Sequence, residues 1–453
     1  MSRLIISVSG VRGIFGDSLT PQIAKQFGEA FAATLPAGAT IVLGRDSRPS
    51  GQSLRDAVIE GLISRGINVI DIGIATTPGT AVMVKHLSAD GGIVITASHN
   101  PPAYNGLKFL SSEGRNLPAD RANKLKEIWE SRNFSSAKTS GRVSINNDVH
   151  QVHTESVLEI IDADAIARKN FKVVLDSING AGCQGSAILL NQLGCQLIHI
   201  NNKPDGQFAH EPEPIEKNLT QLCHLVKQEK ADIGFAQDPD ADRLAVVDQE
   251  GRFVGEEYTL ALAMAFVLKK HKGPVATNLS TSRMIDDITS SAGVELFRTP
   301  VGEANVVDAM VKHNCIFGGE GNGGVIDPRV VLVRDSFAAI ALILNYLAET
   351  DLTVSQLIDA LPRYVMHKDK LPCPREVVPE ILQGVKRKLA SSQQARISEE
   401  DGLRVDLPDC WVHIRPSNTE PIIRIIVEGK DETSTRQLAQ QVRQIAEDVL
   451  NKR

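Results

Sequence analysis

Residues 91–109 read GGIVITASHNPPAYNGLKF, in which a run of small apolar residues ends abruptly in Ser98, His99, Asn100 and two prolines. The apolar run predicts a buried strand, and the polar residues after it predict an exposed turn. Lys108 lies on the segment that returns from this turn. Ligands of open α/β sheets bind beyond the carboxyl ends of the strands, so Ser98 is a candidate nucleophile at that edge.

Strand and helix signals alternate around this stretch. Strands are expected at 41–43, 68–72, 93–95 and from 172, helices at 53–65 and 80–87, a third round at 275–317, and a long helix at 335–349. Strands that alternate with helices predict βαβ units with parallel sheets. The end of the chain differs, because WVHIRP and IIRIIVEG read as two strands before a helix near 434–450, which is an α+β pattern.

The chain has 453 residues, which predicts three or four domains. Linker-like sequences place the domain limits near 150, 252 and 368. The predicted fold is therefore α/β with four domains around a central cleft. Three related mixed α/β domains and a smaller C-terminal α+β domain would span 1–150, 151–252, 253–368 and 369–453.

Composition excludes several classes of protein. The net charge is −6 without a basic block, which argues against binding to nucleic acid. The six cysteines form no C-x-x-C pair, which is typical of free thiols in a reducing compartment. We recognise no signal peptide, and the apolar runs are too short to cross a membrane, so we expect a cytoplasmic protein.

Residues 238–243 read DPDADR and follow the apolar stretch IGFAQ. Asp238, Asp240 and Asp242 would repel each other unless a hard divalent cation lay between them. The loop is not an EF-hand, because Arg243 stands where that motif needs glycine and Gln249 where it needs glutamate. Three ligands with open coordination positions suit Mg²⁺ that bridges to a phosphate. A solvated acidic turn is the alternative.

Two further loops carry polar groups. Residues 318–324 read GGEGNGG, where glycines allow close approach and Glu320 and Asn322 suit vicinal sugar hydroxyls; a flexible turn explains this loop equally well. Residues 415–421 read RPSNTEP, and this loop suits phosphate, with a polar hairpin turn as the alternative. Its candidate donors are Arg415, Ser417, Asn418, Thr419 and, beyond the loop, Arg424.

The serine at position 98 lacks the G-x-S-x-G context of an acyl hydrolase. Neighbouring side chains diverge in extended chain, so His99 is a poor candidate for a base that acts on Ser98. With a metal triad and phosphate donors elsewhere, a phosphoryl-accepting serine is the better interpretation. Four such loops at strand ends predict one shared cleft.

Together these motifs resemble the α-D-phosphohexomutase superfamily. The similar segments are TASHNP, DPDADR, GGEGNGG, RPSNTEP, GVRG at 10–13 and GRDSR at 44–48, and they cover the chain in the family's order. The resemblance implies a four-domain architecture and reversible isomerisation of a 6-phosphosugar to a 1-phosphosugar. The GEGNGG form with VGEANV is most similar to archaeal-type phosphoglucosamine mutases and phosphomannomutase-phosphoglucomutases.

The resemblance also implies a mechanism. Phosphorylated Ser98 would donate its phosphoryl group to the sugar, and the hexose bisphosphate would turn over before Ser98 takes back the other phosphate. One Mg²⁺ per chain would be held by Ser98, Asp238, Asp240 and Asp242. The bisphosphate serves as activator and intermediate, and the hexose phosphate is the small-molecule partner.

Site roles follow from the matched positions. Lys108 is the preferred general acid/base, for which a cationic or pKa-lowering environment is expected. Arg12 would lie near the reacting oxygen, His99 would bond around the phosphoserine, and Arg243 would orient the metal loop. Glu320 and Asn322 would bind sugar hydroxyls. The non-reacting phosphate would be held by Arg415, Ser417, Asn418, Thr419 and Arg424.

The chain departs from many bacterial members of the family at two places. Asn322 and Gly324 replace serine and histidine in the sugar loop, and the segment 300–303 reads PVGE instead of Lys-x-Gly-His. Glucosamine phosphate is the leading substrate, with mannose or glucose phosphate as the alternative, and Glu303 is a hypothetical contact for an amino group. A phosphatase and a non-catalytic sugar-phosphate binder are the rival classes, and the oligomeric state stays open, with a homodimer as one option.

Overall fold

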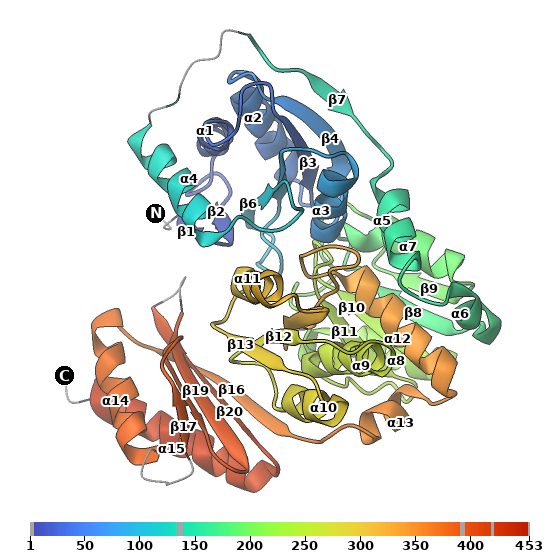
Figure 1. Ribbon diagram of the computed structural model, residues 1–453, viewed down its shortest axis with the longest axis vertical. Coiled ribbons are helices and arrows are strands. Elements are labelled where there is room, and N and C mark those ends of the chain that lie inside the picture. Colours follow the sequence, from blue (N-terminus) through green and yellow to red (C-terminus); the bar gives the residue numbers. More distant parts are fainter. Residues whose placement is uncertain (1–3, 133, 135–138, 390–394, 418–420, 452–453) are drawn as a thin grey trace.

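The computed structural model describes residues 4–132, 134, 139–389, 395–417 and 421–451. These residues form four separate β-sheets with helices packed against them, arranged around a common centre (Figure 1). The N-terminal sheet lies at the top of that view and the C-terminal sheet at the lower left. The predicted class, α/β with a C-terminal α+β unit, is confirmed.

The first sheet has seven strands in the order β1-β2-β6-β5-β3-β4-β7. Its elements are β1 (Ile5–Ser7), β2 (Gly10–Ile14), α1 (Pro21–Ala32), β3 (Thr40–Arg45), α2 (Gly51–Ile63), β4 (Asn68–Ile74), α3 (Thr77–His86), β5 (Gly91–Ile95), β6 (Tyr104–Ser111), α4 (Ala119–Ser131) and β7 (Val143–Ile145). The expectation of a parallel sheet is wrong for half of it, since β6 pairs antiparallel with both β5 and β2. The short connection between β5 and β6 has no room for a crossover helix.

The second sheet has the order β11-β10-β8-β9. Its unit comprises α5 (Val149–Leu158), α6 (Ala163–Lys169), β8 (Lys172–Asp176), α7 (Gly182–Gln192), β9 (Gln196–Ile200), α8 (Thr220–Glu229), β10 (Ile233–Gln237) and β11 (Leu244–Asp248). As in the first sheet, the strand before the site loop is followed by an antiparallel partner, here β10 by β11.

The third sheet has the order β13-β12-β14-β15, again with an antiparallel last pair. Its unit comprises α9 (Glu256–Lys270), β12 (Val275–Asn278), α10 (Met284–Ala292), β13 (Leu296–Thr299), α11 (Glu303–His313), β14 (Phe317–Glu320), β15 (Gly324–Ile326), α12 (Ser336–Thr350) and α13 (Val354–Asp359). The three units therefore share a strand, loop and antiparallel return, which places each site loop equivalently.

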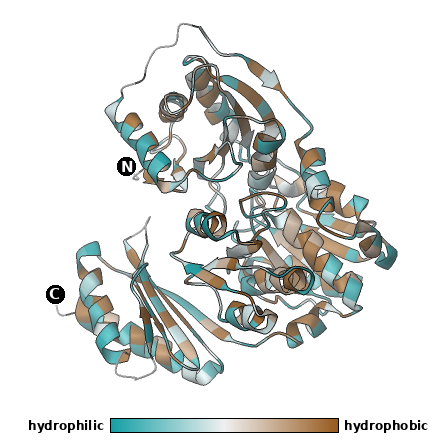
Figure 2. Ribbon diagram, viewed as in Figure 1, coloured by the Kyte–Doolittle hydropathy of each residue, from teal (hydrophilic) through white to brown (hydrophobic). Residues whose placement is uncertain are grey.

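The C-terminal sheet is antiparallel throughout, with the order β16-β20-β19-β18-β17. Its elements are β16 (Val365–Pro372), α14 (Val378–Leu389), β17 (Arg396–Ser398), β18 (Leu403–Asp406), β19 (Cys410–Pro416), β20 (Ile422–Gly429) and α15 (Glu432–Leu450). Helices α14 and α15 cover one face, and their apolar sides form a core separate from the rest of the molecule. Figure 2 shows the outer sides of both helices as largely hydrophilic.

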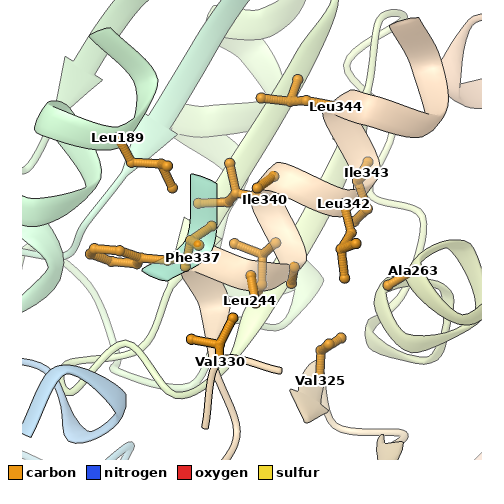
Figure 3. Packing of buried hydrophobic residues seen from close by; sticks show 14 of the residues in the cluster. Leu189, Leu244, Ala263, Val325, Val330, Phe337, Ile340, Leu342, Ile343 and Leu344 are labelled. Carbon is orange, nitrogen blue, oxygen red and sulfur yellow. The ribbon is translucent and has the colours of Figure 1, made fainter. Parts of the chain in front are cut away.

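Helix α12 joins the second and third units. Its sequence is apolar on nearly all sides, which is typical of a fully buried helix. Phe337, Ile340 and Leu344 pack in one cluster with Leu189 and Leu244 of the second unit (Figure 3). Because this core is continuous, the loops that follow β10 and β14 are joined to one shared apolar core.

The proposed limits do not all fall between elements. Residue 150 lies inside α5 and residue 368 inside β16, whereas 252 lies in the turn after β11. The four intervals therefore stay proposals. In the part of the chain that the structure describes, no helix combines the length and apolar character needed to cross a membrane.

Candidate active site

The four sequence-predicted loops meet at one cleft of about 370 Å³. The serine loop follows β5, the metal loop follows β10, the sugar loop follows β14, and the phosphate loop joins β19 to β20. Residues from every unit line the cleft, including His99, Arg243, Glu320, Asn322, Arg415, Ser417 and Arg424. The topology thus brings together side chains that lie far apart in the sequence.

Ser98 differs from the sequence expectation in two ways. It is completely buried rather than exposed, because the metal loop covers it. Its φ of +49° is left-handed, so the chain is not extended there, and its Oγ lies 3.4 Å from Nδ1 of neighbouring His99. The hydroxyl donates a hydrogen bond to Asp238 Oδ2 at 2.8 Å. A non-glycine residue in this conformation is uncommon and strained, and such residues are enriched at active sites.

The GRDSR segment holds the serine loop in place. Arg48 is fully buried and donates to the carbonyl oxygen of Ser98 at 2.9 Å. Asp46 accepts from the guanidinium of Arg48 and from Thr96, whose own hydroxyl accepts the backbone N–H of Ser98. Asp46 and Arg48 therefore support the site, although the sequence assigns the GRDSR segment only a family match and no role.

Asp238, Asp240 and Asp242 converge as predicted. All three are fully buried, and one oxygen of each lies within 4.8 Å of the others. Asp240 Oδ1 and Asp242 Oδ1 have no hydrogen-bond partner among the described residues. A buried carboxylate oxygen without a partner is expensive, and a cation would satisfy both. The donor set, all oxygen with Ser98 Oγ beside it, fits a hard divalent metal.

The other oxygens of the triad are bonded. Asp238 Oδ1 accepts the backbone N–H groups of Asp242 and Arg243 at 3.1 Å. Asp240 Oδ2 accepts from Lys108 at 2.6 Å, and Asp242 Oδ2 accepts from Lys108 at 2.9 Å. Protein donors therefore hold one side of the triad, and its free oxygens are left on the other side.

Lys108 lies in an anionic environment, not the cationic one expected. Burial lowers the pKa of its ammonium, but Asp240 and Asp242 raise it, and the net pKa lies above the ordinary value. The pKa of Asp242 is shifted in the opposite direction. Burial raises this pKa, but Arg334 and Lys108 lower it, and the net pKa lies well below the ordinary value. Lys108 is thus held in its cationic form in this arrangement.

The remaining catalytic candidates surround Ser98. Arg12 on β2 donates to Asn100 Oδ1 at 2.9 Å. Arg243, followed by burial and Arg12, holds the pKa of His99 well below its usual range, so this imidazole is neutral near pH 7. Arg243 Nε is buried and has no hydrogen-bond partner among the described residues, with Asp242 Oδ1 3.9 Å away. These two arginines supply positive charge beside the serine.

The sugar loop is more tightly bonded than its glycines suggest. Glu320 is 3% exposed, and its Oε1 accepts from Asn278 at 2.8 Å and from the backbone of Gly302 at 3.2 Å. Its Oε2 accepts from Arg334 at 2.8 Å and from Asn322 at 3.4 Å. A carboxylate bonded on both oxygens is held in a single orientation.

The phosphate loop is placed by the β19–β20 hairpin. Arg415 and Arg424 are directly paired across the two strands, so both lie at the same end of the hairpin. Asp401 accepts from Arg415 at 2.7 Å, and Ser417 is buried at the strand end. Asn418 and Thr419 lie outside the described residues.

Arg334 is the main site residue that the sequence expectations missed. It is 7% exposed and bonds to Asp242 of the metal loop as well as to Glu320. The sequence signal that could have identified Arg334 as a site residue is a lone arginine between the apolar stretches VVLV and FAAIALIL. Glu303, the hypothetical amino-group contact, is instead buried and paired with Arg334.

A second missed group lies at the start of α9. Glu257 packs its carboxylate against Gly321, where a Cβ would lie only 1.9 Å from Glu257 Oε2. It accepts the backbone N–H of Ser282 and contacts Lys368 on β16 at 3.2 Å. Burial raises the pKa of Glu257 to about 7, although Lys368 opposes this shift.

Glu257 should make stability depend on pH. Between the ordinary pKa of 4.5 and about 7, the folded protein retains a proton that the unfolded chain loses, so stability falls as the pH rises through this window. Glu257→Gln removes this loss. The difference in melting temperature, variant minus wild type, should therefore increase by about 2–4 °C between pH 4.5 and pH 7. Scanning calorimetry of both proteins measures it, with Glu256→Gln as the neighbouring control. A pH-independent difference would contradict the assignment.

A larger cavity, about 830 Å³, lies between the third and fourth units. Two of its arginines are already bonded: Arg404 to Asp406 and Leu279, and Arg283 to the carbonyl oxygens of Leu407 and Pro408. These contacts fasten the two units to each other. None of the residues that line this cavity belongs to the carboxylate triad or to the four predicted loops, so the smaller cleft is the functional candidate.

Comparison with known proteins agrees with this geometry. The chain matches the phosphoglucomutase/phosphomannomutase family over all of its domains: alpha/beta/alpha domain I at 3–136, domain II at 151–251, domain III at 255–364 and the C-terminal domain at 370–445. The four matches lie on the four sheets described above.

Individual relatives span nearly the whole chain. A phosphoglucomutase/phosphomannomutase of Thermococcus kodakarensis is 40% identical, over 94% of this chain and 95% of the relative. A probable phosphoglucosamine mutase of Methanopyrus kandleri is 37% identical, over 95% of each. The crystal structure of a family protein from Burkholderia thailandensis has a TM-score of 0.86 at 27% identity and covers 98% of both chains. With four domain matches in order and relatives above 30% identity along the entire chain, the protein belongs to the phosphoglucomutase/phosphomannomutase family, within the α-D-phosphohexomutases.

Proposed function

We propose that the protein is a phosphoglucosamine mutase that interconverts glucosamine 6-phosphate and glucosamine 1-phosphate. The observation that carries the proposal is the 2.8 Å hydrogen bond from Ser98 Oγ to Asp238, next to a cleft that His99 and Arg243 of the same two loops line together with Arg415 and Arg424. A phosphoryl acceptor, a metal triad and a second phosphate site are needed together only when both ends of a sugar bisphosphate must be held.

The proposed metal is one Mg²⁺ per chain, held by Ser98, Asp238, Asp240 and Asp242. The unpartnered oxygens of Asp240 and Asp242 support it. When bound, the cation would neutralise negative charge on the phosphoryl group during its transfer.

The reaction starts from phosphorylated Ser98. A sugar hydroxyl oxygen attacks the phosphorus, a new O–P bond forms, and the bond from phosphorus to Ser98 Oγ breaks. The hydroxyl loses its proton and the serine oxygen gains one. The bisphosphate then turns end over end, and Ser98 Oγ attacks the other phosphate and releases the isomeric monophosphate.

The chain's own groups orient these steps. Lys108 in its cationic form can give a proton to the sugar oxygen as that oxygen loses its phosphoryl group, and the resulting amine can accept one in the opposite direction. Arg12 and Arg243 place positive charge beside the serine, where the transferred group is most anionic. Neutral His99 can hydrogen-bond the phosphoserine.

One fixed clamp can hold either phosphate of the intermediate. Arg415 and Arg424 offer paired guanidinium groups at the end of the hairpin, with Ser417 next to them. Asn418 and Thr419 are proposed to complete it. Glu320 and Asn322 are proposed to bind hydroxyls that both poses present in the same place.

Glucosamine is favoured over the alternative, glucose or mannose phosphate, on two grounds. Several relatives are named probable phosphoglucosamine mutase. The cleft lining also includes four carboxylates, from Glu213, Glu256, Glu257 and Glu320, alongside the cations of Arg243, Lys368, Arg415 and Arg424, so it offers acceptors for a substrate ammonium group as well as donors for phosphate. We propose a cytoplasmic enzyme that acts on small molecules, and a homodimer can be tested by sedimentation.

The test compares three substrates with purified protein, Mg²⁺ and a trace of bisphosphate. Phosphorus NMR should show 1-phosphate formed from glucosamine 6-phosphate with a higher kcat/KM than from the glucose or mannose 6-phosphates. Release of free phosphate without 1-phosphate would indicate a phosphatase, and binding without turnover would indicate a non-catalytic protein. Equal kcat/KM for all three sugars would contradict the glucosamine assignment alone.

A further inference from the structure

Arg334 lies between the metal triad and the sugar loop. It stands between β15 and α12, and its side chain is 8% exposed. Nη2 donates to Asp242 Oδ2 at 2.7 Å, and Nη1 donates to Glu320 Oε2 at 2.8 Å. One guanidinium therefore contacts two carboxylates that come from different units of the protein.

A third carboxylate forms an ion pair with this guanidinium, without a hydrogen bond to its Nε. Glu303 Oε2 lies 3.3 Å from Arg334 Nε, and Glu303 Oε1 accepts the backbone N–H of Arg334 at 3.0 Å. Glu303 is the first residue of α11 and is itself buried. Because a guanidinium is planar and its donors point in fixed directions, its hydrogen bonds to Asp242 and Glu320 leave it little freedom.

Gly324 provides the space for this arrangement. A Cβ at this position would lie 2.2 Å from Arg334 Cδ, so any larger residue would displace the arginine stem. Gly324 and Glu303 are both positions where the chain departs from the pattern of many bacterial members. Both departures are thus explained by one buried arginine.

The contacts leave one oxygen of Asp242, Oδ1, without a hydrogen bond among the described residues. Arg334 and Lys108 both bond to Asp242 Oδ2, and Oδ1 has no hydrogen-bond partner among the described residues. The partners of a metal ligand that lie outside the coordination sphere orient it and are worth about 10–100-fold in metal affinity or activity. Through its other arm, the same arginine holds Glu320.

We propose that Arg334 is a positioning residue that couples the metal site to the sugar loop: it aims Asp242 Oδ1 at the metal and fixes Glu320 for the sugar. The inference rests on the proposed function only for the identity of the sugar. Filling of either site then stabilises the same arrangement of Arg334, so the two sites assist each other.

Metal affinity separates this role from a simple effect of charge. A cation beside the triad repels a metal, so its removal would strengthen metal binding if charge alone mattered. Removal of a positioning residue has the opposite effect and weakens metal binding. In sugar-free protein with Ser98 unphosphorylated, Arg334→Met should weaken Mn²⁺ binding about tenfold, measured by the EPR signal of free Mn²⁺.

Matched variants control for folding and for charge. Arg329→Met removes another arginine of the same loop, which bonds to buried Asp327 away from the triad, and should leave the Mn²⁺ affinity unchanged. Arg334→Lys keeps the charge but cannot span two carboxylates, and should also weaken Mn²⁺ binding. Near-ultraviolet circular dichroism confirms that each variant is folded.

Coupling to the sugar loop is measured with a double-mutant cycle. Glu320→Gln is not at a metal ligand, yet it should weaken Mn²⁺ binding about threefold when Arg334 is present and have no effect in Arg334→Met. Titration with glucosamine 6-phosphate in EDTA should also show weaker binding to Arg334→Met than to Arg329→Met.

Three results would overturn the proposal: Mn²⁺ binding that is unchanged or tighter in Arg334→Met, wild-type Mn²⁺ binding in Arg334→Lys, or an effect of Glu320→Gln that persists without Arg334. The Mn²⁺ arms need no turnover. Failure of the mutase assignment would therefore appear in the NMR assay while the coupling could still be observed, and the two failures are distinguishable.

Discussion

Ser98→Ala is expected to abolish interconversion of the hexose phosphates, with a loss in kcat on the order of 10⁴-fold or more. The hydroxyl is the only group of this residue that can carry the phosphoryl, and its Oγ is the atom beside Asp238. Positioning by the rest of the cleft cannot replace a missing covalent acceptor. The measurement is the rate of 1-phosphate formation by phosphorus NMR.

Ser111→Ala is the matched control for this variant. Ser111 is also a buried serine of the first unit, at the end of β6, and its hydroxyl accepts a backbone N–H of the following turn. It should retain nearly full activity. Mass spectrometry should find phosphate on Ser98 in the wild type after incubation with bisphosphate, and none in Ser98→Ala. Turnover that survives in Ser98→Ala would reject the phosphoserine mechanism.

Asp240→Asn is expected to weaken Mn²⁺ or Mg²⁺ binding by about a hundredfold or more and to lower kcat/KM in parallel. The amide has nearly the same shape, but it removes one negative charge from the triad and turns one oxygen into a donor. Asp240 Oδ1 is one of the two unpartnered oxygens that fit the cation. Isothermal titration with Mn²⁺ gives the affinity directly.

Asp248→Asn controls for loss of a buried carboxylate. Asp248 ends β11 and accepts from Glu250 and Arg252 in a turn, so its replacement should lower stability modestly and leave metal affinity unchanged. EDTA should reduce wild-type activity to the level of Asp240→Asn, and Mg²⁺ should restore it in the wild type only. Equal metal affinity in Asp240→Asn and the wild type would show that the metal binds elsewhere.

Much of the site could be predicted from short segments. Asp238, Asp240 and Asp242 are close in sequence, so their convergence depends on one loop, and the repulsion between them is evident without a fold. Ser98 and the glycine-rich sugar loop each follow an apolar strand, and that local pattern places them at a sheet edge. The long helix expected at 335–349 is found at Ser336–Thr350, because an apolar stretch of that length has few other ways to be buried.

The errors share a physical cause. The sequence predicts that Ser98 is exposed and lies in extended chain. Contact with the metal loop, which is distant in the sequence, buries Ser98, and the backbone of Ser98 is left-handed. The cationic environment expected for Lys108 is wrong because its neighbours, Asp240 and Asp242, come from another unit. A pKa depends on charges close in space, and local sequence does not show which charges those are.

By itself, the sequence determined the candidate parts of the site: Ser98 after an apolar strand, the carboxylate triad, the glycine-rich loop and the RPSNTEP loop, each at a strand end and each encoded within a few residues. The tertiary structure alone decided how these parts act on each other. It buried Ser98 under the triad, raised the pKa of Lys108 so that this side chain is cationic, and placed Arg334 between Asp242 and Glu320. Burial and Coulomb interactions depend on distance in space, and only the packing of the units against each other sets those distances.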